Sequence, residues 1–340
     1  MAVNLLLSFA MNSCSLWSRK GWSVNDYPNV RIQFVDSKSG FIIGPRLIRT
    51  LDGGSSWTVT EYRQIEDTLR AEGSLEPYAH DVGFVDRDWG WRLSMVDKNS
   101  VEWTEDSGQS WSKPISFGAN IYQRSLVFVS RDRGWVLGEQ KVMKTNDRGK
   151  HWMVENELMA LSLEFPAFVD DDHIWLASNQ GTIARTIDGG EHWIISHDLP
   201  KNVTNIFFIS ATLGWAVGEK GLIAHTEDGG LHWRTQEAAL PYDEKAKQSP
   251  TLMDIFFIDS LSGWICGNDG LILRTMDGGS SWRSTTSITK EPLVSIRFVD
   301  AAHGWAVGGF PEPAIPTLGP SNVVLETTDG GETWKRKEFK

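Results

Sequence analysis

The stretch Thr226-Glu227-Asp228-Gly229-Gly230-Leu231-His232-Trp233 decides the fold, because its pattern, Thr-x-Asp-x-Gly-x-x-Trp, occurs seven times in the 340 residues. We call each copy a box. Successive boxes lie about 40 to 54 residues apart, which is the period of one four-stranded propeller blade. The boxes carry the pairs Asp52 and Trp57, Asp106 and Trp111, Asp147 and Trp152, Asp188 and Trp193, Asp228 and Trp233, Asp277 and Trp282, and Asp329 and Trp334.

A second motif precedes each box and fixes the repeat unit. A Phe is followed about six residues later by a Gly-aromatic step, as in Phe208 and Gly214-Trp215, and only the fourth repeat departs, with Ile174-Trp175. Apolar and β-branched runs bounded by Gly and Asp predict strands, which we letter A to D. The sequence therefore predicts an all-β fold, a seven-bladed β-propeller of four-stranded antiparallel blades, with the box as the turn between strands C and D.

Every box residue has a structural role in this interpretation. The Asp side chain is expected to accept backbone N–H groups two residues on, while Gly adopts a positive φ and Thr supplies a second acceptor. The Trp ring is expected to fold over the turn and bury a large apolar area. Of the 17 tryptophans, only Trp17, Trp22, Trp89 and Trp103 lie outside the boxes and the strand B positions.

The composition argues against nucleic-acid binding and against a transmembrane segment. The net charge is −11 and no run of Lys or Arg stands out, whereas nucleic-acid binding needs a basic face. No segment is long and apolar enough to cross a bilayer, so no transmembrane segment is predicted. Residues 29–340 are predicted to form the propeller, and residues 1–28 an N-terminal extension.

The N-terminal extension has two interpretations. An apolar run that ends at Ser13-Cys14 resembles the end of a bacterial lipoprotein signal, although residues 1–4 carry no positive charge. This predicts a protein of the cell envelope, on the periplasmic or lumenal side, with a lipid anchor at Cys14; the alternative is a cytoplasmic protein. Residues 21–30 can also be aligned on residues 193–203, which indicates a strand that closes the propeller, and residues 334–338 are the alternative fourth strand of the last blade. Cys266, inside a predicted strand, is expected to be a buried apolar thiol.

Three insertions are predicted to lie on one face. In a four-stranded meander the B-to-C and D-to-A connections share a face, and residues 61–79, 237–250 and 309–321 all fall in such connections. We call this the insertion face and expect a protein or peptide partner there, since binding residues concentrate on loops. The alternative is a set of solvated loops. The candidate contact residues are Tyr62, Arg63, Arg70, Tyr78, Tyr242, Phe310, Pro311 and Pro313.

Polar residues at the start of strand A predict a polar channel mouth on the same face. Three residues before the strand A Phe stand Arg31, Asp81, Asn205 and Asp254 in four of the repeats. Two readings remain open for them. They form either a mutually hydrogen-bonded lining or a site for a small ligand or a peptide terminus.

The sequence gives little support for an enzyme. Sialidases share the box but use a tyrosine nucleophile with an arginine cluster, and Arg31-Ile32-Gln33 lacks the proline of the sialidase motif. Asp81 and Asp254 are the one conceivable carboxylate pair. The histidines that precede box tryptophans, His151, His192 and His232, lie on separate turns. We therefore predict no catalytic residue, no metal site and no cofactor.

The repeated Gly-Trp-Ala-Val-Gly of residues 214–218 and 304–308, together with the boxes, resembles the photosystem II stability and assembly factor family over residues 29–340. The resemblance implies a propeller without catalytic activity that assists assembly by binding a precursor subunit, with lipoprotein members on the lumenal side. Two features depart from the family. Its photosynthetic members carry clustered arginines, whereas Arg31, Arg124 and Arg297 alone stand on the inner strands here, and all seven boxes are intact.

Together these features predict a non-enzymatic protein- or peptide-binding scaffold of the cell envelope, of which photosystem II assembly is one version. One alternative is a carbohydrate-binding or glycoside-hydrolysing propeller, in which Trp89, Trp103 and the channel carboxylates would converge. Another is a purely architectural module of a larger complex.

Overall fold

The computed structural model describes residues 30–44, 47–60, 82–93, 99–118, 123–138, 141–159, 161–238, 240, 249–285, 288–309 and 322–338. They fall into two compact units, Asn29–Ser162 and Leu163–Glu338. The first holds three sheets and the second holds four, and we refer to them as the three-blade and four-blade units. The N-terminal extension, with Cys14 and the predicted closing strand, lies outside the described residues.

The strands follow the repeats in order. In the three-blade unit they are β1 Arg31–Phe34, β2 Gly40–Ile43, β3 Leu47–Thr50, β4 Thr58–Thr60, β5 Val82–Phe84, β6 Gly90–Leu93, β7 Ser100–Thr104, β8 Ile115–Ser116, β9 Gln123–Phe128, β10 Gly134–Gly138, β11 Val142–Thr145 and β12 Met153–Val154, followed by the 3-10 turn η2 Asn156–Leu158.

The four-blade unit repeats the same order. Its elements are β13 Phe165–Phe168, β14 Ile174–Ala177, β15 Ile183–Thr186, β16 Ile194–Ser196, β17 Val203–Phe208, β18 Gly214–Gly218, η3 Glu219–Gly221, β19 Ile223–Thr226, β20 Arg234–Gln236, β21 Leu252–Phe257, β22 Gly263–Gly267, η4 Asn268–Gly270, β23 Ile272–Thr275, β24 Arg283–Ser284, β25 Leu293–Phe298, β26 Gly304–Gly309, β27 Asn322–Thr327 and β28 Lys335–Arg336.

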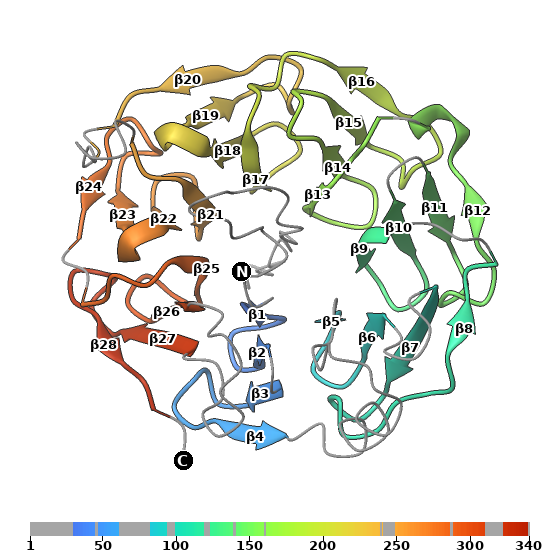
Figure 1. Cartoon of the computed structure of the whole chain (residues 1–340), viewed down its shortest axis with the longest axis horizontal. Coiled ribbons are helices and arrows are strands. Elements are labelled where there is room, and N and C mark those ends of the chain that lie inside the picture. The colour runs from blue at the N-terminus through green and yellow to red at the C-terminus, as the bar shows by residue number, and fades with distance from the viewer. Residues whose placement is uncertain are drawn as a thin grey trace, which may run out of the picture. The chain divides into compact units, whose positions relative to one another are not determined.

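Each sheet contains four strands in sequence order, and each strand pairs antiparallel with the next (Figure 1). The seven sheets confirm the predicted fold class, a seven-bladed β-propeller. The fourth strand of the last blade is β28, so the segment after Trp334 forms a strand as the repeat predicts.

In the four-blade unit the fifth and sixth blades each pack between two sheets, so their strands A to C are largely buried on both faces. All five residues of β18 and of β22 are buried. In the four-blade unit the A strands β13, β17, β21 and β25 contact one another in turn, and we call them the inner strands. The D strands lie at the opposite edge of each sheet and carry exposed residues, as β28 does at both positions. Burial on both faces explains the continuous apolar runs of strands A to C.

Stacked aromatic rings join consecutive blades of the four-blade unit. The indole of strand B stacks on the Phe of the next inner strand, in the pairs Trp175 and Phe208, Trp215 and Phe257, and Trp264 and Phe298, with ring centroids 3.9, 3.6 and 3.6 Å apart. The indole Nε1 also donates to the next box. Trp264 bonds Gly330 O at 2.8 Å and Trp175 bonds Gly229 O at 2.9 Å. Trp175, Trp215 and Trp264 therefore each tie their blade to the following one by packing and by a hydrogen bond.

The same packing explains the glycine of the Gly-aromatic step. Gly214 lies opposite Phe208 in the β17–β18 register, and a β-carbon there would overlap the Phe208 ring. The fourth repeat carries Ile174 opposite Phe168, and both side chains are buried.

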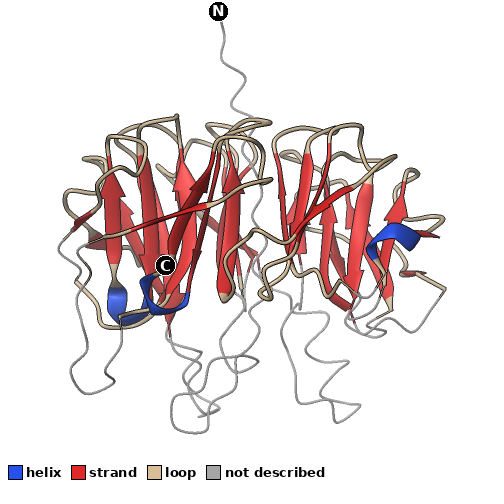
Figure 2. Ribbon diagram, turned by 90° about the horizontal axis from the view of Figure 1, so that it is seen from above, coloured by secondary structure: helices blue, strands red, loops and turns tan. Residues whose placement is uncertain are grey.

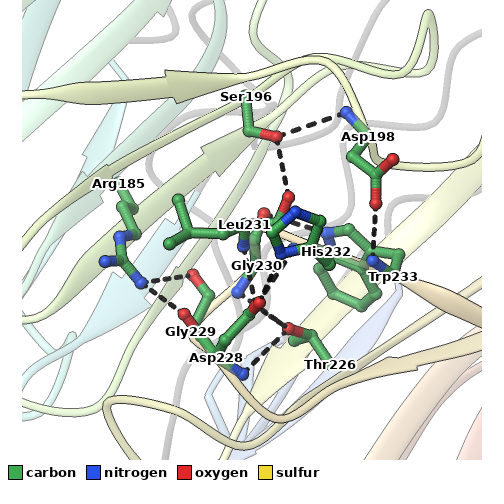
Figure 3. A network of polar contacts seen from close by, with 10 residues as sticks. All are labelled: Arg185, Ser196, Asp198, Thr226, Asp228, Gly229, Gly230, Leu231, His232 and Trp233. Atoms are coloured by element: carbon green, nitrogen blue, oxygen red, sulfur yellow. Dashed lines mark hydrogen bonds and ion pairs between the residues drawn. The ribbon is translucent and has the colours of Figure 1, made fainter.

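The box is a self-contained hydrogen-bonded turn, shown for the fifth blade in Figure 3. Thr226 Oγ1 donates to Asp228 Oδ1 and accepts the Gly230 N–H, each at 2.9 Å. Asp228 Oδ1 also accepts the N–H groups of Leu231 and His232 at 3.0 Å. The bond from Gly N–H to Thr Oγ1 recurs in all seven boxes at 2.8 to 2.9 Å.

One detail of the predicted box chemistry is wrong. The Asp carboxylate accepts N–H groups three and four residues on, not two, because the chain continues around the carboxylate after a glycine with φ of +89° at Gly230. The two-residue contact occurs instead in the A-to-B turns, where Asp36 Oδ1 accepts Lys38 N–H at 2.7 Å.

The box tryptophans pack edge-on against the strand A phenylalanines, as Trp233 does on Phe208 at 5.9 Å and 81°. In the four-blade unit all four box tryptophans are buried, with 4 to 9% exposure. In the three-blade unit Trp57, Trp111 and Trp152 are half-buried. The box rings thus pack on the strand A phenylalanines, with less complete burial in the first three blades.

The turns divide between two ends of the blades. The turns η3 and η4, which join strands B and C, lie at one end (Figure 2), and the antiparallel order places the boxes at the other. Asn202, in a D-to-A connection, bonds Asn179 O at 2.7 Å and accepts Glu219 N–H at 3.0 Å. The B-to-C and D-to-A connections of the fourth and fifth blades therefore share one face, as predicted. In the part of the chain that the structure describes, no helix has the length and apolar character needed to span a membrane.

The interblade contact of Trp264 can be separated into its two parts. Trp264→Phe keeps the stack on Phe298 but removes the donor to Gly330 O, so we expect a loss of about 0.5–1.5 kcal/mol in the free energy of unfolding. Trp264→Ala removes both and should cost about 3–5 kcal/mol. Denaturant unfolding measures the two values. Equal losses for the two variants would contradict the assignment of most of the energy to the stack.

The boxes predict a stability loss in acid. The Ser56 hydroxyl and backbone N–H hold the pKa of Asp52 at about 2, and those of Thr333 hold the pKa of Asp329 at about 2, against an ordinary value of 3.8. A folded-state pKa below the unfolded value gives stability that is present above the unfolded pKa and lost as the pH falls through the folded one. The melting temperature should therefore fall between about pH 4 and about pH 2.

The matched variant is Asp329→Asn, measured by the same thermal scans. Its melting temperature should be lower than that of the wild type at pH 7. On acidification its melting temperature should fall by less, because the carboxylate that titrates has been removed. An unchanged acid slope in this variant would show that Asp329 does not contribute to it.

Candidate partner-binding face and the inner-strand polar network

The predicted contact residues of the insertion face lie outside the described residues. They are Tyr62, Arg63, Arg70, Tyr78, Tyr242, Phe310, Pro311 and Pro313. Asp81 lies outside them as well. Their assignment to a partner stays a prediction, and the geometry that the structure describes is that of the inner strands.

Two of the predicted channel-mouth residues are brought together in the four-blade unit. Asn205 on β17 and Asp254 on β21 are 0% and 1% exposed. Asn205 Nδ2 donates to Asp254 Oδ1 at 2.6 Å. The strand after these, β25, supplies Arg297, whose Nη1 lies 2.5 Å from Asp254 Oδ2. One polar network therefore runs across three consecutive inner strands.

The Asp254 carboxylate is fully occupied by donors. Besides Asn205 and Arg297, the backbone N–H groups of Ile255 and Ile296 donate to Oδ1 and Oδ2, each at 2.9 Å. A carboxylate offers about four lone-pair sites, and four donors fill them. Burial raises the pKa of Asp254 above its ordinary value, while Arg297 and the Ile296 N–H oppose that shift. The positive charge of Arg297 is therefore paired with the carboxylate of Asp254 inside the fold.

Arg31 belongs to the three-blade unit and makes a different contact. Its guanidinium carbon lies 5.9 Å from the centre of the Trp91 ring, and the side chain is half-buried at the start of β1. On the same strand, the Gln33 side chain bonds both the N–H and the carbonyl of Phe84, which ties β1 to β5. Of the predicted channel-mouth residues, Asn205 and Asp254 are thus bonded to each other inside the fold, and the role of the set stays a prediction.

One buried ion pair was not identified from the sequence. Arg92 on β6 and Glu102 on β7 are each 6% exposed, and Arg92 Nε donates to Glu102 Oε2 at 2.7 Å. The guanidinium carbon also stands 4.3 Å from the centre of the Trp111 ring. The pair could have been predicted from the sequence, because the two residues lie opposite each other in the hairpin register and carry opposite charges.

The described contacts restrict which side chains are available for ligand binding or catalysis. Trp89 is fully buried and packs edge-on against Phe128, so it offers no face to a sugar ring. The box histidines contact the aspartate of their own turn, as His232 Nδ1 does with Asp228 Oδ2 at 2.7 Å. Among the described residues there is no cluster of three metal-binding side chains. Cys266 is buried as predicted, and burial raises the pKa of its thiol well above the usual range.

The sequence and the fold are similar to those of known assembly factors. The family model "Photosynthesis system II assembly factor YCF48" matches residues 154–233 and 194–286. The predicted resemblance to this family is thus confirmed over part of the chain. Comparison with the curated proteins gave no significant match.

Among solved structures, "YCF48 bound to D1 peptide" is 16% identical, with a TM-score of 0.64, and the match covers 95% of this chain and 96% of that one. YCF48 from Cyanidioschyzon merolae is 17% identical, with a TM-score of 0.63 and coverage of 89% and 96%. The GH74 xyloglucanase from Xanthomonas campestris is 12% identical, with a TM-score of 0.64, but the match covers 88% of this chain and 52% of the enzyme. At these identities the structures establish a shared fold.

The Asp254–Arg297 pair can be tested by a double-mutant cycle in urea. Asp254→Asn leaves the buried guanidinium without its counter-charge, so we expect a loss of about 3–5 kcal/mol in the free energy of unfolding. Adding Arg297→Met should restore part of that loss, because no buried charge is then left unpaired. Additive losses from the two substitutions would contradict the pairing.

Proposed function

We propose that this chain is a non-enzymatic, peptide-binding scaffold that assists the assembly of a larger protein complex. The observation that carries the proposal is the similarity to the YCF48 assembly factor, found both in the family model over residues 154–286 and in the fold over 95% of the chain. One of those YCF48 structures contains a D1 peptide. By analogy, the partner here is an extended segment of a protein, and photosystem II assembly is the specific version of the role.

The inner-strand network favours a scaffold over a hydrolase. Glycosidases use two carboxylates, one of which must give or take a proton near the scissile bond. The four acceptor positions of Asp254 are filled by donors within the fold. Asp254 would have to break these bonds to act as a base. Of the two tryptophans that the carbohydrate alternative requires, Trp89 is buried and Trp103 is half-buried.

We assign partner binding to the insertion face. In the four-blade unit the described B-to-C turns are short and bonded to themselves, as Leu222 N–H is to Glu219 O at 3.0 Å and Leu271 N–H to Asn268 O at 3.1 Å. The three long insertions are the parts of this face with enough chain to wrap a peptide. A location in the cell envelope, with Cys14 as the lipid-bearing residue, forms part of the same proposal.

The test is affinity capture of the tagged full-length protein from its native cells, with mass spectrometry of what it retains. Replacement of residues 62–78 or 311–319 by a short Gly-Ser linker should abolish capture of the partner. The melting temperature should change little, because surface loops contribute little to the core. The matched control is Leu261→Ser with Met276→Ser, which alters two residues exposed at 56% on the opposite face.

Capture that survives both loop replacements would remove these two insertions from the proposal. A defined glycan bound by the wild type, with no protein partner, would instead favour the carbohydrate-binding alternative. Mass spectrometry of the mature N-terminus reads out the location separately, since an unmodified Cys14 would contradict the lipid anchor.

A further inference from the structure

In two of the three junctions of the four-blade unit, the strand C residue before the box Thr is an arginine that contacts the box of the next blade. Arg185 on β15 donates through Nη1 to the carbonyl oxygens of Asp228 and Gly229, at 2.6 and 3.2 Å (Figure 3). Arg274 on β23 donates to the Glu332 carboxylate in the box of the seventh blade. We call this contact the arginine clamp. A hydrogen bond from a charged donor is stronger than one between neutral groups, so each clamp strengthens its junction.

The described residues form no such clamp between the fifth and sixth blades. The equivalent residue on β19 is His225, which lies opposite Trp215 as Arg185 lies opposite Trp175. Residues opposite each other in an antiparallel pair share a face of the sheet. His225 therefore faces the sixth blade together with the Trp215 ring. Its Nδ1 is buried and has no hydrogen-bond partner among the described residues.

The space that the guanidinium fills in the preceding junction is open in this one. A β-carbon at Gly229 would lie 2.3 Å from Arg185 Nη1. At Gly278, the equivalent residue of the sixth-blade box, the carbonyl oxygen of Ser260 is the one described atom within 4 Å of that position. The indole bond is also longest here, since Trp215 Nε1 lies 3.3 Å from Gly278 O, against 2.9 and 2.8 Å in the other two junctions.

A second buried polar atom weakens the closed form of this junction. Gln236, at the end of β20, has a buried Oε1 with no hydrogen-bond partner among the described residues. This oxygen lies 3.2 Å from the position of a β-carbon at Gly279, in the box of the sixth blade. A buried polar atom without a partner costs free energy, and contact with water removes that cost. His225 and Gln236 thus both favour opening of the junction.

We propose that the four-blade unit opens locally at the junction between its fifth and sixth blades, by separation of the Trp215 and Phe257 rings, before the unit unfolds as a whole. Local opening occurs where the fewest stabilising contacts have to be broken. The 237–250 insertion connects these two blades, because it lies between β20 and β21. Opening of the junction therefore changes the spacing between the two ends of this insertion.

The test is hydrogen exchange of the indole N–H groups, followed by heteronuclear NMR on the full chain. Trp175, Trp215 and Trp264 are all 0% exposed, so their exchange rates report the opening of the three junctions. Trp215 should exchange at least about tenfold faster than the other two, which is the effect of one missing hydrogen bond from a charged donor. His225→Arg supplies that donor and should slow the exchange of Trp215 by a similar factor.

The substitution follows an arrangement that the next blade already contains. On β23 Arg274 lies opposite Arg283, just as His225 lies opposite Arg234 on β20. A second arginine beside Arg234 is therefore compatible with the fold of a blade.

Two further variants separate the clamp from a general effect of charge. Thr235→Arg adds the same charge at an exposed position of β20, on the other face of the strand from Arg234, and should leave the exchange of Trp215 unchanged. Arg185→His removes the clamp of the preceding junction and should speed the exchange of Trp175, which keeps the test available if His225→Arg does not fold. Equal exchange rates for the three indoles in the wild type would overturn the proposal. An unchanged Trp215 rate in folded His225→Arg, or an unchanged Trp175 rate in Arg185→His, would overturn it as well.

Discussion

The structure depends on the stacking of an aromatic ring of one blade on an aromatic ring of the next blade. A strand B indole stacks on the inner-strand Phe of the following blade and donates its N–H to the glycine carbonyl of that blade's box. A four-stranded sheet with two apolar faces cannot bury both on its own, so each blade requires a neighbour. The stacked rings are buried at that contact, and the indole hydrogen bond fixes its alignment.

Features with a local cause could be predicted from the sequence. The box is formed by residues within eight positions of one another. The glycine of the Gly-aromatic step is needed because a Phe ring packs against its α-carbon. Both features can therefore be recognised within a single repeat. The blade number, the strand order and the face of the turns follow from them. The error on the Asp acceptor arose because Asp turns of two kinds exist here, and the shorter kind lies between strands A and B.

The inner-strand network could be predicted only in part. The polar character of Asn205 and Asp254 stands out in an apolar strand, but their partner Arg297 lies on a different inner strand, 43 residues after Asp254. That contact depends on how three blades align side by side, which no spacing within one repeat encodes. The network has a cost as well as a role. A buried ion pair contributes little net stability, yet it penalises any alignment of the inner strands that separates its members.

The self-contained box has a consequence for how such a chain can change in length. Each turn is satisfied by its own Thr and Asp, and the described junctions stack a strand B ring of one repeat on the Phe of the next, as Trp264 does on Phe298 and Phe41 does on Phe84. A whole repeat can therefore be duplicated or lost with the ring contact of the new junction already present. A deletion or duplication of any other length would separate a ring from the ring on which it stacks. Gain and loss of sequence in a protein of this kind should therefore come in whole repeats or be confined to the connections between them.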